Sequence, residues 1–286
     1  MKKLIRLNNI DELTAEEDEE LARKIQYFDQ TIRNYIEYRK PTSWLEARRD
    51  GLREELEALE ETIENAKSGD GYGPDGRSTG VLHPSGIKGC PLRAVWGMTR
   101  SGKSRGIDVD MDLLCDVGSA MHLWHQAYLT DMYGGFFIPE VRIGSYPYAQ
   151  EHGIDGHADG ILTWEFDTFR TVINVEIKTT GLKKFGKITN GPLNEHKDQS
   201  TIYMKALNTP YVLFIYACRD DGRVRTMPYR FDPRRFAKLD KKIQDINKHI
   251  GTDMTKGRID ALAQPSYFEC RDCQFSYECP KKGGKK

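Results

Sequence analysis

The chain has 286 residues, of which 38% are hydrophobic and 30% charged, and its basic and acidic side chains are equal in number. This length allows one large domain or two modest ones, and the composition is typical of a globular protein with a strongly charged surface. No apolar run reaches the roughly 20 residues that a membrane helix needs, and the first residues lack the apolar core of a signal peptide. We therefore expect a cytoplasmic protein with no membrane contact.

Residues 11–67 carry the apolar spacing of two helices. Apolar residues recur at steps of three and four on either side of Pro41, and each run begins with a capping-box pattern. We expect an antiparallel helical hairpin here and a boundary in the Gly-rich stretch that follows, giving units over 1–70 and 71–286. The first 67 residues hold 12 basic and 17 acidic side chains, so we do not expect them to face DNA. They are a candidate surface for self-association or for a partner protein.

Residues 97–104 match the phosphate-binding pattern GxxxxGKS letter for letter. That pattern needs a buried strand before it and a helix after it, so that backbone amides surround the phosphate. Here the preceding residues are helical in character and residues 105–108 show no apolar stripe, so we interpret the match as chance in a basic loop. Lys103 and Arg105 of this loop are candidates to bind nucleic-acid phosphate.

The spacing of apolar residues predicts a helix over 116–133. Its expected buried stripe consists of Val117, Met121, Trp124 and Tyr128. His122 and His125 lie beside that stripe. A histidine on a helix is more often structural than a metal ligand, so this segment alone assigns neither.

A strand over 171–178 is the central prediction, because β-branched residues dominate it and neither Gly nor Pro interrupts it. Alternation sends its odd-numbered apolar residues into the core, and Asn174, Glu176 and Lys178 to the other face. A strand that begins at residue 154 leads through a hairpin into this one, and antiparallel pairing would bring Asp159 near Glu176. Taken alone, Glu176 and Lys178 would be a surface ion pair.

The remaining segments complete an α/β pattern. Residues 194–207 form a helix on which Gln199 and Tyr203 lie one turn apart. Residues 211–217 form a fully apolar central strand, and a short partner strand and an amphipathic helix follow up to residue 250. We expect a central mixed sheet flanked by helices, preceded by the N-terminal hairpin.

Four cysteines bracket the sheet-forming segment: Cys90, Cys270, Cys273 and Cys279. Three thiolates separated by two and five residues, with a distant fourth, can bind an iron–sulfur cluster or a structural zinc ion. In a cytoplasmic chain such clustering favours a metal over disulfides. Cys115 and Cys218 stand next to apolar residues, and we expect them to be core thiols.

The acidic residues suggest a second kind of metal site. Asp159, Glu176 and Lys178, with His122 upstream, would form a site that cleaves phosphodiesters. Carboxylate oxygens suit Mg²⁺ or Mn²⁺, and a histidine nitrogen favours Mn²⁺. The cation would polarise the scissile phosphate and lower the pKa of a bound water, which Lys178 would orient.

The chain resembles the PD-(D/E)xK nuclease superfamily, and within it the RecB-like branch. Four motifs in order carry the resemblance: Gly118-x3-His122, Gly156-x2-Asp159, Glu176-x-Lys178 and Gln199-x3-Tyr203. The resemblance implies a restriction-endonuclease-like core in which the histidine, both acids and the carbonyl of Ile177 bind the metal. It also implies that the lysine assists the water and that the Gln and Tyr contact DNA. Ala158 stands where the superfamily pattern has proline, and His125 and His157 are alternative ligands.

The cysteine arrangement is similar to that of the iron–sulfur nucleases of this branch, the AddB type and the CRISPR-associated RecB-like exonucleases. Over residues 85–280 it implies a structural 4Fe–4S cluster, with zinc as the alternative. The family implies an exonuclease that acts on single-stranded DNA ends, 5′ to 3′, in recombination, repair or phage replication. Two alternatives stay open: a non-catalytic DNA-binding or adaptor protein that keeps the fold, and a nucleotide-binding protein with a phosphate loop.

Overall fold

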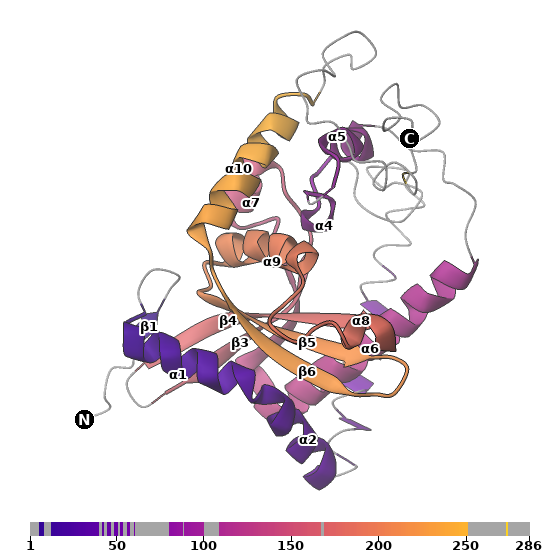
Figure 1. Cartoon of the computed structure of the whole chain (residues 1–286), viewed down its shortest axis with the longest axis vertical. Helices are drawn as coiled ribbons and strands as arrows, with labels where there is room; N and C mark the ends of the chain where they lie inside the picture. Colours follow the sequence, from indigo (N-terminus) through magenta and orange to yellow (C-terminus); the bar gives the residue numbers. More distant parts are fainter. Residues whose placement is uncertain are drawn as a thin grey trace.

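The computed structural model describes residues 6–8, 13–39, 80–87, 89–99, 109–166, 169–250 and 273, with scattered positions between 42 and 60. In this part of the chain a six-stranded mixed sheet has the order β2-β3-β4-β5-β6, and β1 pairs with β4 (Figure 1). The strands are β1 (Arg6–Asn8), β2 (Phe137–Arg142), β3 (His157–Glu165), β4 (Phe169–Thr180), β5 (Tyr211–Cys218) and β6 (Val224–Arg230). The predicted α/β class with a central mixed sheet is confirmed.

Helices cover both faces of the sheet. They are α1 (Ala15–Gln26), α2 (Phe28–Tyr38), α4 (Pro84–Ile87), α5 (Pro91–Thr99), α6 (Val109–Tyr133), α7 (Pro147–His152), α8 (Leu182–Phe185), α9 (Asn194–Leu207) and α10 (Pro233–Asn247). Helices α1, α2 and α6 lie on one side, and α9 lies on the other with α4, α5, α7 and α10 beyond it (Figure 1). Among the described helices, none combines the length and apolarity that crossing a membrane requires.

β4 is buried on both faces. Its alternation is as predicted, because Ile173, Val175 and Ile177 belong to the apolar cluster that contains α1 and α2 side chains. Glu176 is on the opposite face, which lies towards α9. In the parallel pairing of β4 with β5, Glu176 lies opposite Phe214. A strand flanked by neighbours in a layered α/β sheet has no solvent face. Glu176 is therefore fully buried, and the simple surface ion pair is excluded.

The N-terminal helices pack onto the sheet. Leu21 and Ile25 of α1 and Phe28 and Ile32 of α2 are buried in the same cluster as the apolar face of β4. The expected capping box opens α1, but a turn at Tyr27 divides the predicted first helix in two. The described positions between 42 and 60 are helical. The boundary expected near residue 70 lies outside the described residues and stays a prediction.

Helix α6 presents a different face from the one predicted. Val117 and Trp124 are 45% and 42% exposed, whereas His125, Gln126 and Leu129 are buried. Apolar periodicity misjudged the face because this helix buries the polar side chains of His125 and Gln126. The same error affects Cys115, which is exposed and not a core thiol, while Cys218 is fully buried as expected.

Candidate active site

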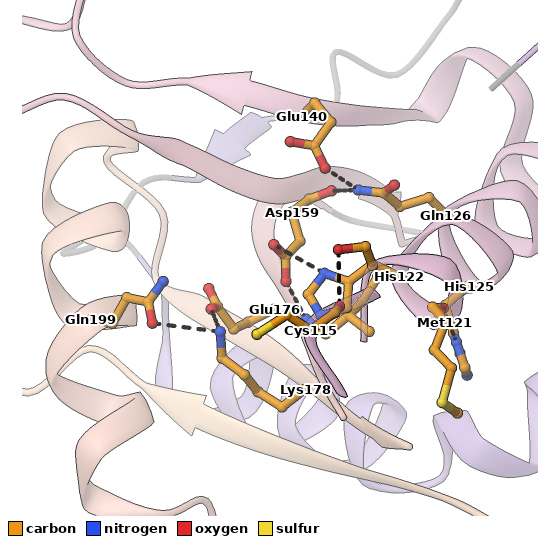
Figure 2. Close-up of polar contacts among 12 residues, drawn as sticks. Cys115, Met121, His122, His125, Gln126, Glu140, Asp159, Glu176, Lys178 and Gln199 are labelled. Carbon is orange, nitrogen blue, oxygen red and sulfur yellow. Dashed lines mark hydrogen bonds and ion pairs between the residues drawn. The ribbon is translucent and has the colours of Figure 1, made fainter. Parts of the chain in front are cut away.

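Asp159 and Glu176 meet because β3 and β4 pair in antiparallel fashion. Gly160 lies opposite Val175, so the next position in register places Asp159 beside Glu176 on the same face. Asp159 Oδ2 accepts a hydrogen bond of 2.6 Å from the Ile177 N–H (Figure 2). This bond fixes the Asp159 carboxylate over β4, as the hairpin prediction required.

His122 approaches the same carboxylate from α6. Its Nδ1 lies 3.6 Å from Asp159 Oδ1. Burial alone would raise the pKa of Asp159, but His122, Lys178 and the Ile177 N–H outweigh burial and hold that pKa below its ordinary value. Burial lowers the pKa of His122, and Asp159 more than reverses this, so the imidazole pKa is raised. The two groups therefore stabilise each other's charged forms.

His125 points away from these residues (Figure 2). Its Nδ1 lies 2.7 Å from the Met121 carbonyl oxygen, which can only accept, so Nδ1 carries the proton and donates. Burial lowers the pKa of His125 and keeps the ring neutral. Of the two candidate histidines on α6, the structure places His122 at the site.

Glu176 is 0% exposed, and its Oε2 accepts no hydrogen bond from the described residues. The Lys178 ammonium forms an ion pair with Oε1 (Figure 2). Burial raises the pKa of Glu176 to about 7; the Lys178 charge opposes this rise and the Asp159 charge adds to it. A buried carboxylate with unused acceptor capacity lowers the stability of the fold, so its presence here indicates a functional role.

Lys178 links the acids to α9. Its Nζ donates to Gln199 Oε1 at 3.4 Å while pairing with Glu176. Burial lowers the pKa of Lys178, but Glu176 and Asp159 outweigh burial and raise it, so the amine stays protonated. Tyr203, one turn after Gln199, is only 4% exposed, and burial followed by the charge of Glu176 raises its pKa. Both residues lie at the site. Gln199 is partly exposed, whereas Tyr203 is buried.

The donor set fits a hard divalent cation. Glu176 offers Oε2, which has no hydrogen-bond partner among the described residues, and Oε1 beside Lys178; Asp159 offers Oδ1, and His122 offers a ring nitrogen. Within the described residues, no three His, Cys, Asp or Glu side chains already stand together as a cation site. Holding one cation would therefore require small side-chain movements of these residues, with the Lys178 ammonium adjusting beside Glu176.

Sequence reasoning missed two residues here. Gln126, buried on α6, donates from Nε2 to the Asp159 carbonyl oxygen at 2.9 Å and to Glu140 Oε1 at 2.6 Å (Figure 2). Glu140 of β2 has a backbone φ of 47°, a value that residues other than glycine rarely adopt. The spacing of Gln126 one helical turn after His122 could have identified it. Nothing in the sequence marks Glu140.

Two of the four bracketing cysteines approach one apolar cluster. Cys90 is buried within it and Cys273 packs against it, although the sequence separates them widely. The Lys242 ammonium donates to the Gly89 carbonyl oxygen at 2.6 Å and so joins α10 to the Cys90 segment. The other proposed thiolates and phosphate contacts lie outside the described residues: Cys270, Cys279, Lys103 and Arg105.

No protein-family model and no curated protein matches the sequence. Among solved structures, the chain is similar to SSO0001, with 20% identity and a TM-score of 0.44 over 73% of this chain and 90% of that one. It is also similar to the alkaline exonuclease LHK-Exo from Laribacter hongkongensis, with 15% identity, and to LHK-Exo in complex with dAMP, with 14% identity. Both of these have a TM-score of 0.46 and cover 64% of this chain and 93% of theirs.

Proposed function

We propose that this chain is a divalent-metal-dependent deoxyribonuclease of the PD-(D/E)xK type, in the RecB-like branch. The observation that carries the proposal is the Glu176 carboxylate: it is fully buried next to Asp159, its Oε1 pairs with Lys178, and its Oε2 has no hydrogen-bond partner among the described residues. A cation bound there would supply the missing partner of Glu176, which explains why the fold tolerates an otherwise costly group.

Each residue has a separate role in this proposal. His122, Asp159, Glu176 and the Ile177 carbonyl would hold Mg²⁺ or Mn²⁺. When bound, the cation would polarise the scissile phosphate and lower the pKa of a water molecule. The Ile177 N–H orients Asp159 through its 2.6 Å bond, while the Ile177 carbonyl would bind the cation.

Lys178 supplies the positive charge that would act on the transition state. Glu176 and Gln199 hold its ammonium in place and the acids keep it protonated. In that position it would orient the attacking water and offset negative charge that develops on the phosphorane oxygens. Gln199 thus positions Lys178, and Tyr203 is proposed to contact DNA close to the scissile bond.

We also propose that Cys90, Cys270, Cys273 and Cys279 bind a structural 4Fe–4S cluster, with zinc as the alternative. The shared apolar cluster of Cys90 and Cys273 supports this, because it brings the two ends of the domain together. Anaerobic purification should give a brown protein with broad visible absorption and iron in elemental analysis. A colourless protein that contains one zinc ion would replace the iron–sulfur proposal with the alternative.

Single-stranded ends, 5′ to 3′ polarity and a place in recombination, repair or phage replication are proposed from the family resemblance alone. The test is incubation of 5′- and 3′-labelled, single- and double-stranded DNA with the protein in Mn²⁺, with EDTA and circular DNA as controls. We expect labelled linear single strands to be degraded from the 5′ end in Mn²⁺ only.

Glu176→Ala and Lys178→Ala are the matched controls for the site. If both variants degrade DNA as fast as the wild type, the assignment of the site is wrong. A folded wild type that binds DNA but degrades none supports the non-catalytic alternative. Loss of a nucleotide-dependent activity in Lys103→Ala would favour the phosphate-loop protein.

A further inference from the structure

A basic surface lies at the end of the sheet just past Lys178. Its side chains come from α8 with its following loop, from the segment that joins β5 to β6, and from the start of β6: Lys183, Lys184, Lys187, Arg219, Arg223 and Arg225. We call this set the basic platform. The Arg219 N–H donates to the Thr180 carbonyl oxygen at 3.0 Å, and Arg225 Nη1 donates to the Phe185 carbonyl oxygen at 3.3 Å. The two segments therefore form one surface, and Figure 1 shows α8 and the β5–β6 turn at the same end of the sheet.

Phe185 holds the arginines of the platform in place. Its ring is buried, and the guanidinium carbons of Arg223 and Arg225 lie 5.4 and 4.8 Å from the ring centroid. Stacking of a guanidinium on an aromatic ring restricts its movement while leaving N–H donors available. The surface is thus partly pre-organised, unlike a set of independent solvated lysines.

Each of the three nearby acids pairs with one cation of the platform, Asp220 with Arg219 at 3.9 Å, Asp221 with Arg223 at 2.8 Å and Glu195 with Lys184. Two of these acids also accept hydrogen bonds from the backbone. Asp220 Oδ2 accepts from the Leu182 N–H at 2.6 Å, and Asp221 Oδ1 accepts from the Arg223 N–H at 3.1 Å. Glu195 pairs with one lysine of the platform at 2.5 Å. Six basic side chains face these three acidic ones, which leaves a local net charge of +3 in a chain with no net charge overall.

Two of the three uncompensated charges of the platform belong to lysines. Lys183 and Lys187 are exposed, and in the part of the chain that the structure describes neither ammonium pairs with a carboxylate. Lys183, the first residue of the platform, follows Lys178 by five residues, so the two Cα atoms are at most about 18 Å apart. A DNA strand with its scissile phosphate at Lys178 would extend far enough to reach the platform.

We propose that the basic platform binds the phosphate backbone of the DNA strand that is cut at Lys178. The inference rests on the proposed function and adds the direction in which the substrate extends from the site. Phosphates are the partner that a dense, partly pre-organised set of arginines and lysines fits best. Contacts of this kind position the strand without reading its sequence.

The test compares two double variants that each remove two exposed lysines. Lys183→Ala/Lys187→Ala changes the platform, and Lys238→Ala/Lys241→Ala changes α10, which lies on the far side of α9 from the sheet (Figure 1). Binding of a fluorescein-labelled single-stranded oligonucleotide is measured by anisotropy in EDTA, so that no cleavage occurs, over a range of NaCl concentrations. The platform variant should bind every sequence more weakly, and its slope of log K against log salt should fall by about 1.4, or 0.7 for each lost phosphate contact.

The α10 variant should keep the wild-type affinity and slope. Wild-type behaviour of the platform variant, or equal losses in both variants, would overturn the inference. If the wild type degrades DNA in Mn²⁺ while the platform variant keeps its slope, the platform is wrong and the nuclease proposal stands. If the wild type degrades no DNA while only the platform variant loses affinity, the nuclease proposal is wrong and the platform stands.

Discussion

Two buried carboxylates on neighbouring segments of the sheet differ sharply in their surroundings. Asp155, just before β3, is 8% exposed and accepts bonds of 2.8 to 3.2 Å from Arg142 and one of 2.8 Å from the Gly156 N–H. A Cβ at Gly144 would lie 2.5 Å from its Oδ1, so the chain leaves room for this carboxylate. Glu176 has a cation beside its Oε1 as well, but its Oε2 accepts no hydrogen bond from the described residues.

The pKa values of the two carboxyl groups are shifted in opposite directions. Burial would raise the pKa of Asp155, but Arg142 and the Gly156 N–H outweigh it and lower that pKa. Burial dominates at Glu176 and raises its pKa to about 7. A carboxylate with hydrogen bonds to both oxygens supports the fold, whereas one with an oxygen left unpaired keeps binding capacity for a ligand.

The largest expected effect is on catalysis. Glu176→Gln should lower the rate of Mn²⁺-dependent DNA degradation about 10³-fold or more, because a charged cation ligand is lost. The same variant should unfold at the wild-type temperature or above it in EDTA, since it removes an ionisable group that burial penalises. A variant with full activity, or one that is strongly destabilised, would remove the distinction between the two carboxylates.

Lys178→Met should reduce the rate by about 10²- to 10³-fold, as expected for the loss of one electrostatic group that acts on the transition state. The buried Glu176 would then lack its cation, and its pKa should rise further. Single-turnover kinetics on labelled DNA measure the first effect. A rate within threefold of the wild type would contradict the role of Lys178.

The sequence allows the active-site strand to be predicted because period-two alternation and a hairpin are local signals. Asp159, Glu176 and Lys178 come together as expected for that reason. The face of α6 was not predictable from apolar periodicity, because Gln126 is a polar residue that the fold buries for its bonds to Asp159 and Glu140. The left-handed backbone of Glu140 depends on the tertiary fold and has no local sequence signature.

Asp155→Asn should lower the free energy of unfolding by about 1–3 kcal/mol, because it removes a charge-assisted pair whose arginine is partly exposed. The folded-state pKa of Asp155 is depressed, so its stabilisation is present above the unfolded pKa of about 4 and is lost as pH falls below it. Urea unfolding at pH 7 and pH 3 measures both effects. An equal difference between wild type and variant at both pH values would contradict this account.

The smallest expected effect is a pH dependence of Mn²⁺ binding. Because the folded-state pKa of Glu176 is raised to about 7, a proton competes with the cation below that pH. The dissociation constant should therefore increase by up to about tenfold as pH falls from 7 to 6, and should change little between pH 8 and 9. Identical affinities at pH 6 and pH 8 would show that Glu176 does not exchange a proton for the metal.

Calorimetric titration of Mn²⁺ into the wild type, Asp155→Asn and Glu176→Gln at pH 8 tests the central claim most directly. The account predicts that the wild type and Asp155→Asn bind Mn²⁺ alike, and that Glu176→Gln binds it at least about 100-fold more weakly. Binding by Glu176→Gln with the wild-type affinity would contradict the claim that the unsatisfied carboxylate on β4 is a metal ligand.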